Sequence, residues 1–198
     1  MSARKDQRKA RVRVEIVRSI DALLEVWSVR SLVYLGEQAC PYEEEFDGND
    51  LAGATHLIAR IGAEPVATMR IRWFADFAKI ERVAVRASHR SGEVSAALVS
   101  AALELAARKG YAKVLGHIQK RLLRYWRRAA DVRVREGRSE FRFSDYDYVE
   151  IEKDLAPAAN AIGLQTPPMI VLRPEGDWDR PGVLERSTRR ALSQSRAR

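Results

Sequence analysis

The sequence is poor in the residues that form disulfides and metal sites. Cys40 is the only cysteine among 198 residues, so an intramolecular disulfide is excluded. We expect an inert, partly buried thiol, because no other feature of the sequence supports thiol catalysis. The three histidines, His56, His89 and His117, lie far apart without ligand spacing, so no metal site is predicted.

Long hydrophobic runs are also missing. No apolar segment approaches the roughly 20 residues that a membrane-spanning helix needs. The basic N-terminus is not followed by an apolar segment and a small-residue cleavage site, so we expect no secretory signal. Apolar residues make up 46% and charged residues 31% of the chain, as is usual in soluble globular proteins. Together these features predict a cytoplasmic protein without a membrane span.

The net charge of +8 is concentrated at the two ends of the chain. Residues 1–13 and residues 180–198 each hold six lysines or arginines against one acidic residue, which leaves the central part slightly acidic. We interpret the ends as basic arms, which attract polyanions such as nucleic acid or an acidic partner protein. The alternative is a pair of solvated tails, since neither arm has an aromatic residue that could stack on a base.

Hydrophobic periodicity and chain breakers predict the order of the elements. Ser19 is the expected N-cap of the first helix. Residues 40–54 should be a loop or a broken helix, and the five prolines of residues 155–182 predict an irregular crossing segment. The predicted strands cover residues 11–17, 55–61, 66–74, 77–85, 112–117, 131–135 and 140–153. The predicted helices cover residues 19–37, 94–108, 119–130 and 183–193.

This order places one strand–helix–strand unit, with a parallel pair, inside a mostly antiparallel sheet. Such a mixture excludes a doubly wound parallel sheet and predicts an α+β fold. The expected division is a basic N-terminal arm at 1–13, one domain at 14–154, and a proline-containing extension with a basic tail at 155–198.

Four segments resemble the GNAT (Gcn5-related) acyltransferase superfamily, and together the resemblance covers about residues 12–154. EPVATMRI (64–71) is similar to the strand pair of that family, and KIERVAVRASHRSGEVSAALVSAAL (79–103) to its donor-binding strand, loop and helix. VRSLVYLGEQACPYEEEFDGND (29–50) resembles the acceptor-side helix and loop, and RLLRYWRRAADVRV (121–134) the last helix and following strand. The resemblance implies a mixed sheet flanked by helices.

The resemblance also implies acetyl-CoA, or a longer acyl-CoA, as co-substrate and no metal. The backbone of Val83 and Val85 would bind the pantetheine arm, and a loop before a helix would bind the pyrophosphate. In this loop the sequence departs from the family pattern, because Glu93 takes the first glycine position and Gly92 is displaced by one. The loop donors that remain are Arg90, Ser91, Gly92 and Ser95.

The implied chemistry is direct attack of a primary amine on the thioester. Glu81 matches a strand carboxylate that acts as general base in several family members, and the strand alternation puts it on the same face as Val83 and Val85. The alternative for Glu81 is an ion pair with Arg70, Arg72 or Arg82. Tyr125 is the expected acid for the leaving thiolate, with a core aromatic as its alternative.

Three functional readings stay open. The first is an N-acyltransferase that acts on a small-molecule or peptide amine, with the acidic segment Glu43–Asp50 either attracting a cationic acceptor or merely solubilising a loop. The second is an N-acyl synthase of the autoinducer-synthase type, which takes its acyl group from an acyl carrier protein captured by the basic arms. The third is a non-catalytic module that binds nucleic acid or an assembly. Residues 155–182 could cover an acceptor cleft or pack against a second subunit in a homodimer.

Overall fold

The computed structural model describes residues 11–90, 92–143 and 145–187. The described strands form one eight-stranded sheet in the order β1-β2-β3-β4-β5-β8-β6, with β7 pairing beside β8. The helices are α1 (Ile20–Arg30), α2 (Tyr42–Glu45), α3 (Glu93–Arg108), α4 (Leu123–Ala130) and α5 (Pro168–Val171). The strands are β1 (Val12–Ile16), β2 (Thr55–Ile61), β3 (Glu64–Trp73), β4 (Ala78–Val85), β5 (Lys113–Gln119), β6 (Arg133–Val134), β7 (Phe141–Phe143) and β8 (Tyr146–Asp154).

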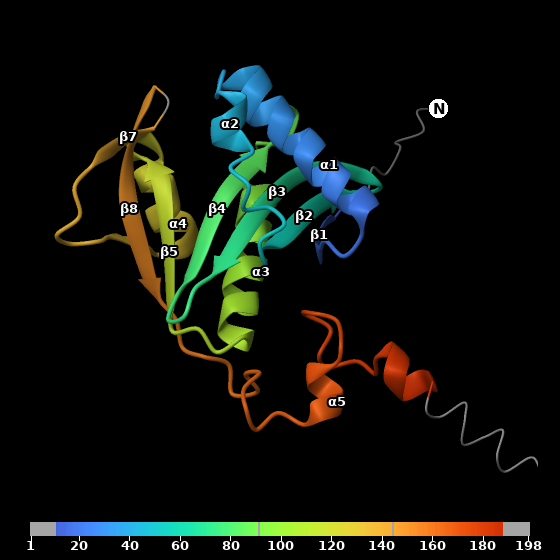
Figure 1. The fold of residues 1–198 in the computed structure, drawn as a ribbon. Helices are drawn as coiled ribbons and strands as arrows, with labels where there is room; N and C mark the ends of the chain where they lie inside the picture. The colour runs from blue at the N-terminus through green and yellow to red at the C-terminus, as the bar shows by residue number, and fades with distance from the viewer. Residues whose placement is uncertain (1–10, 91, 144, 188–198) are drawn as a thin grey trace, which may run out of the picture.

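The sheet is mixed, as the sequence predicts. Only β4 and β5 pair in parallel among the described strands, and α3 connects them; the other neighbours are antiparallel. Figure 1 shows α1 crossing one face of the sheet, while α3 and α4 lie on the other. The α+β class is therefore confirmed. No helix among the described residues has the length and apolar character needed to span a bilayer.

Two unequal apolar cores fill these layers. The larger lies under α3, where Leu98 and Ala102 pack with sheet residues such as Leu57, Met69 and Ile71, all at most 1% exposed. A smaller core on the opposite face joins Ala84 of β4 to Val29 and Val33. Residues 83 and 85 of β4 pack toward the larger core and residue 84 toward the smaller one.

Most element predictions hold, with local differences. Ser19 caps α1 by accepting a hydrogen bond from the Ala22 amide at 3.2 Å, and the helix continues to Glu37 as a π-helix, Ser31–Glu37. The single strand predicted at 140–153 is wrong: it divides into β7 and β8, which form a hairpin that reverses between Phe143 and Tyr146. The predicted helix at 183–193 is helical over 183–187, and its remainder lies outside the described residues, as do the outer parts of both basic arms.

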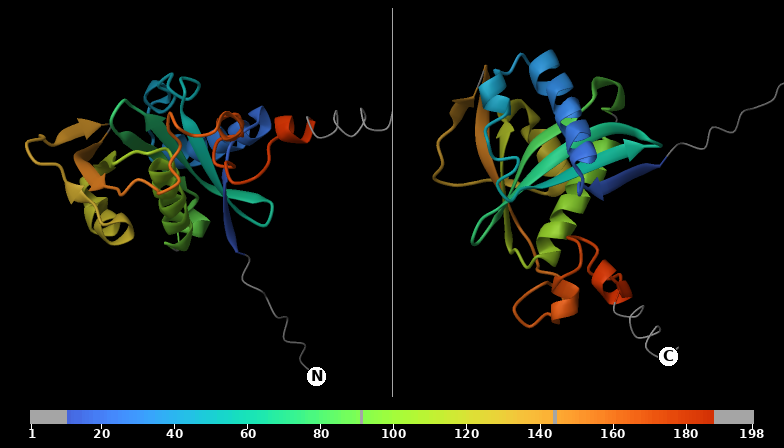
Figure 2. Two further views of the ribbon diagram at one scale, coloured as in Figure 1. Left: turned by 90° about the horizontal axis from the view of Figure 1, so that it is seen from below. Right: turned by 45° about the vertical axis from the view of Figure 1, so that its right-hand side comes forward.

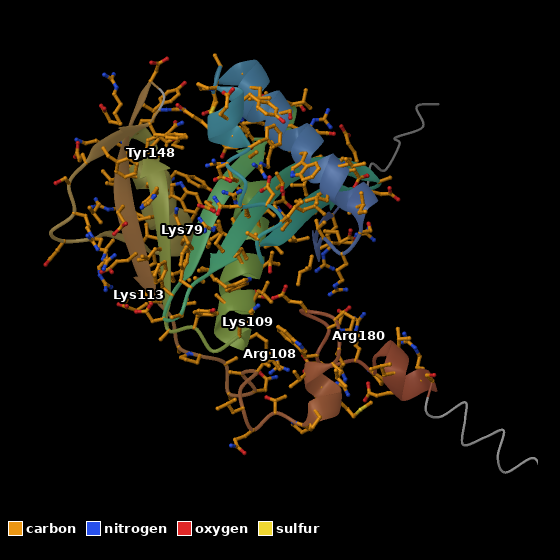
Figure 3. The ribbon with its side chains drawn as sticks, viewed as in Figure 1. Lys79, Arg108, Lys109, Lys113, Tyr148 and Arg180 are labelled. Carbon is orange, nitrogen blue, oxygen red and sulfur yellow. The ribbon has the colours of Figure 1, made fainter. Side chains whose placement is uncertain are left out.

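The C-terminal extension packs on its own domain. The backbone amide of Ile162 donates to the carbonyl of Arg108 at 2.8 Å, at the end of α3, and Trp178 is 7% exposed within the larger core. Arg108 also forms an ion pair with Asp179 at 2.8 Å, and Thr55 donates to Glu175 at 2.8 Å. Figure 3 labels Arg108 and Lys109 at this end of α3, with Arg180 in the extension. None of the described residues of the extension lines the cleft described below, so its role in covering an acceptor or contacting a second subunit stays a prediction.

Gly176 provides a test of this anchoring. Its φ is +81°, and an added Cβ would lie 2.3 Å from Cδ1 of Ile16 in β1. We predict that Gly176→Ala lowers the free energy of unfolding by about 1–3 kcal/mol, through overpacking and left-handed backbone strain. Gly53→Ala is the matched control, because its φ of +73° carries the same backbone strain and nothing lies within 4 Å of its Cβ position. Equal denaturant midpoints for the two variants would contradict the docked position of the extension.

Candidate active site

Strands β4 and β5 part within the sheet. They pair only over Ala78–Ile80 and Val114–Gly116, and the last pair joins Ile80 to Gly116. Beyond this pair, β4 continues to Val85 along β3, while β5 continues to Gln119 along β8. Figure 1 shows β4 and β5 separating toward one end of the sheet. The parted edges therefore expose backbone groups that a closed sheet would use for its own ladder.

A β-bulge at Arg82 accompanies the parting. The register of β3 and β4 shifts between Thr68 and Arg70, and Arg82 has a φ of +52°, in the left-handed region. A bulge adds one residue and so reverses the alternation of side chains beyond it. Glu81 consequently faces the α1 side of the sheet, opposite Arg70, while Val83 and Val85 face α3. The prediction that Glu81 shares a face with these two valines is wrong for this reason.

The parting opens into a cleft of about 570 Å³. It is lined by residues of β4 and β5, the start of α3, the inner side of α4, and Tyr34 of the π-helix segment. Among the predicted site residues, the lining includes Glu81, Val83, Val85, Arg90, Gly92, Ser95 and Tyr125. Ser91 lies outside the described residues. The structure thus brings together every described residue that the sequence predicts for the site.

The carbonyls of the parted strand already accept side-chain hydrogen bonds. The hydroxyl of Tyr34 donates to the Val83 carbonyl at 2.9 Å, and Nε of Arg90 donates to the Val85 carbonyl at 3.0 Å. A carbonyl oxygen has two lone pairs, so each can accept a second hydrogen bond. Burial is the main cause that raises the pKa of Tyr34, which keeps its hydroxyl a donor.

At the other end of the cleft, α3 begins with a backbone that favours an anion. Gly92 is its N-cap with a φ of +83° and without a side-chain capping bond. The 16-residue helix directs its positive end here. Glu93, the first helical residue, is exposed, and the cleft is lined here by Gly92 and Ser95 instead. The glutamate at the first glycine position therefore leaves this end of the cleft open.

Tyr125 connects α4 to the first turn of α3. Its hydroxyl donates to Oγ of Ser95 at 2.6 Å, and Ser95 donates in turn to the Gly92 carbonyl at 3.2 Å. Trp126, its neighbour, is 8% exposed and packs edge-on against the Tyr125 ring. Tyr125 therefore lines the cleft through its half-buried hydroxyl and also packs against the larger core, as its alternative assignment expects.

Glu81 is held by cations. Nε of Arg70 donates to Oε1 of Glu81 at 3.0 Å, and Nζ of Lys79 lies 2.9 Å from Oε2. The Arg70 side chain is fully buried and the Glu81 side chain is 10% exposed. The ion pair with Arg70 that the sequence offered as an alternative is therefore present, while Glu81 still lines the cleft.

Three carboxylates of the acidic segment, those of Glu45, Asp47 and Asp50, belong to a largely buried network with three arginines. Arg30, which is 0% exposed, pairs with Glu45 and, at 2.6 Å, with Asp50. Arg70 binds Asp50 at 2.7 Å and Asp47 at 2.6 Å. Arg82 forms ion pairs with Glu45 and with Asp47, each at 3.1 Å. These ion pairs hold the bulge against α2 and the loop after it.

This network changes the interpretation of three carboxylates of the acidic segment, while Glu43 is exposed. Glu45 is 1% exposed and Asp50 is 9% exposed, so they do not solubilise a loop. The carboxylates of Glu45, Asp47 and Asp50 are paired with the chain's own arginines. Their negative charge is therefore largely compensated and would attract a cationic acceptor only weakly. Burial opposes ionisation of Asp47 and Asp50, but hydrogen bonds from Arg70, and for Asp50 also from Arg30, hold both pKa values below the ordinary range.

Sequence reasoning missed a second titratable group at the cleft. His117 is the first residue of β5 beyond the last pair with β4, as Glu81 is the first in β4. Nε2 of His117 lies 2.9 Å from Oε2 of Glu150 in β8. Burial opposes ionisation of Glu150, but hydrogen bonds from His117 and Arg135 hold the pKa of this carboxyl below its ordinary value. No sequence signal marks His117, because its position depends on where two strands stop pairing.

The two flanks of the parting thus carry different chemistry. The α1 side presents Glu81, His117 and Tyr148, and the helix side presents the start of α3 with Tyr125. Figure 3 labels Lys79 and Tyr148, which come from β4 and β8 on the two sides of the parting. This arrangement can hold an extended chain through the parted strands, an anion at α3, and a proton-exchanging reactant at the opposite face.

Comparison with known proteins fits this geometry. The model of the acetyltransferase (GNAT) family matches residues 21–130. An uncharacterised N-acetyltransferase of Bacillus subtilis, YjcF, is 35% identical over 95 residues, which make up 48% of this chain and 66% of that protein. The match therefore spans just under two thirds of this curated relative.

Solved structures share the fold at low identity. The crystal structure of an N-acetyltransferase from Lactobacillus plantarum, whose assignment is provisional, has a TM-score of 0.67 and 20% identity, covering 73% of this chain and 98% of that one. The CoA-dependent acyl-homoserine lactone synthase BjaI, solved with SAM and isopentyl-CoA, has a TM-score of 0.62 and 16% identity, covering 73% and 83%. With the family model matching more than half of its length, this chain belongs to the GNAT acetyltransferase family.

Proposed function

We propose that this protein is an N-acyltransferase that moves an acyl group from acyl-CoA to a primary amine. The observation that carries the proposal is the parting of β4 from β5 after the Ile80–Gly116 pair, which opens a cleft leading to the start of α3. Its volume of about 570 Å³ lies in the range of sites that enclose a small-molecule ligand. The family membership supports the same class of donor.

The donor would lie along this cleft in two parts. The pantetheine arm would add hydrogen bonds to the exposed backbone of Val83 and Val85, much as a strand would. The pyrophosphate would meet the positive end of α3, where Gly92 allows close approach to the backbone. Arg90 and Ser95 line this end, and Arg90 is paired with Glu37. We favour CoA over an acyl carrier protein as the carrier, because the anion site at α3 suits a pyrophosphate.

The reaction would take place where the strands part. The amine nitrogen attacks the thioester carbonyl, the C–N bond forms, and the C–S bond breaks with the electron pair leaving on sulfur. One proton must leave the amine, and one must reach the thiolate. Tyr125 is our proposed acid for the thiolate, because its hydroxyl lines the cleft; to donate its proton to the sulfur it would leave the hydrogen bond to Ser95. Two groups flank the amine position: Glu81, directly or through water, and His117, which Glu150 orients.

The acceptor remains a small-molecule or peptide amine in this proposal. The competing function is a non-catalytic module that binds nucleic acid or an assembly through the basic arms. A homodimer is compatible with either function. The open end of the cleft at Gly92 favours the enzyme, since a degenerate loop that had lost its ligand would not need to stay open.

Donor binding tests the proposal. We predict that isothermal titration with acetyl-CoA or octanoyl-CoA gives a saturable signal, and that Gly92→Ala weakens binding about tenfold by holding the phosphates off the backbone. Gly137→Ala is the matched control, because its φ of +71° and empty surroundings resemble those of Gly92 away from the cleft. If no acyl-CoA binds and no thioester co-purifies, the proposed function is wrong. A steep loss of nucleic-acid affinity with salt would then support the binding module.

The proton acceptor is tested by kinetics. We predict that Glu81→Gln lowers kcat at least about tenfold, within the range of general-base catalysis. His117→Gln is the comparison, because His117 follows the last β4–β5 pair on β5 as Glu81 does on β4. Thermal unfolding of each variant separates this effect from the loss of the Arg70 ion pair. Should only His117→Gln lower kcat, Glu81 is not the base.

A further inference from the structure

The outer side of α1 and of the π-helical segment that continues it carries an uncharged ridge. Ile20, Leu24, Ser28, Leu32 and Gly36 follow one another at every fourth position, and all five are exposed. Ile20 is 76%, Leu24 51% and Leu32 55% exposed. A surface helix ordinarily turns charged and polar residues toward solvent on this side. The outer face of α1 is therefore the reverse of an ordinary amphipathic helix.

The ridge is uncovered in the described part of the molecule and continues onto α2. In the right-hand view of Figure 2, α1 lies across the front of the sheet, and no described segment passes over it. The ring of Tyr42, which is 63% exposed, packs on Phe46 at 4.9 Å, and Phe46 contacts Trp27 of α1 at 6.4 Å. Contiguous exposed apolar surface of this kind marks an interaction site.

The charges beside the ridge exclude a strongly charged partner on this face. Glu25 forms an ion pair with Arg60, and Glu37 forms one with Arg90. Asp21 lies at the N-terminal edge of the ridge, and none of the five ridge residues is a cation. A polyanion or an anionic membrane thus finds no positive charge on the ridge. An apolar partner can cover it without burying an unpaired ion on the ridge itself.

The ridge is complementary to a second copy of itself. Leu24 and Leu32 lie equally far from Ser28 on its two sides, and so do Ile20 and Gly36. An antiparallel copy with Ser28 at the twofold axis would therefore place Leu24 opposite the partner's Leu32 and Ile20 opposite the partner's Gly36. A large side chain would meet a residue without one, and the small serine would permit close approach. Ridges with this four-residue spacing interdigitate in the commonest class of helix packing.

We propose that the protein forms a symmetric homodimer through this ridge, with the two α1 helices antiparallel and Ser28 at the axis. The inference goes beyond the proposed function and does not depend on it. The eighteen residues of α1 and its continuation span about 27 Å. One helix pair of this length, even when widened by Tyr42, covers less than the roughly 800 Å² per partner of a standard interface. The dimer therefore forms at micromolar concentration and is not permanent.

The interface adjoins the candidate active site. Leu32 of the ridge and Tyr34 of the cleft belong to the same π-helical segment, Ser31–Glu37. The hydroxyl of Tyr34 donates to the Val83 carbonyl at 2.9 Å. A second copy packed on the ridge would thus support, from outside, the segment that contacts the parted strand.

Sedimentation of the full chain over the micromolar range tests the inference. The expected result is a dimer fraction that rises with concentration. Leu24→Arg adds two charges to each dimer by symmetry and is expected to raise the dissociation constant at least about a hundredfold. Leu172→Arg is the matched control, because this leucine is 60% exposed in the extension. Thermal unfolding confirms that both variants are folded. A chain that stays monomeric, or a dimer lost through Leu172→Arg and not through Leu24→Arg, overturns the inference.

Disulfide trapping tests the position of the axis. Ser28→Cys is made together with Cys40→Ser, which removes the chain's only native thiol. At the axis the two introduced thiols would lie within disulfide reach of each other. Ser100→Cys in the same background is the control, because Ser100 is an exposed serine of α3. Mild oxidation is expected to give covalent dimers with Ser28→Cys and not with Ser100→Cys. Equal yields would show that the ridge is not the contact.

Discussion

The bulge at Arg82 is the constraint on which the site depends. A non-glycine residue in the left-handed region costs about 1–2 kcal/mol, so the surrounding structure must hold it there. Arg82 is held by its ion pairs with Glu45 and Asp47, which come from α2 and the loop after it. Glu81, before the bulge, faces α1, and the bulge turns Val83 and Val85 toward α3, so one strand lines the cleft from both faces of the sheet.

The same buried charges unite the α1 side of the molecule. Arg30 and Arg70 are 0% exposed and share Asp50 as a partner, with Trp27 and His56 completing the hydrogen bonds around that residue. Removing one partner of such a buried pair typically costs about 3–5 kcal/mol, because it leaves a charge without compensation. The network therefore links α1, α2 and the two central strands into one unit, and Glu81 is its member at the cleft.

Sequence patterns predicted the architecture better than the site. Alternation in residues 66–74 and the alanine-rich helix after Gly92 were sufficient for the mixed sheet, because both signals are local. The left-handed conformation of Arg82 has no local signal, since arginine rarely adopts it and ion pairs from distant residues impose it. For the same reason the sequence did not indicate that Glu45 is buried or that His117 lines the cleft. The docking of Trp178 depends on the end of α3, about 70 residues earlier in the chain.

The central claim is that the parted edge of β4 and the first turn of α3 together bind the donor. Amide hydrogen exchange, followed with and without saturating acyl-CoA, tests it most directly. The account predicts slower exchange at Val83, at Val85 and in the first turn of α3, because the ligand would occupy these backbone groups. Protection confined to other elements, with binding independently established, would contradict it.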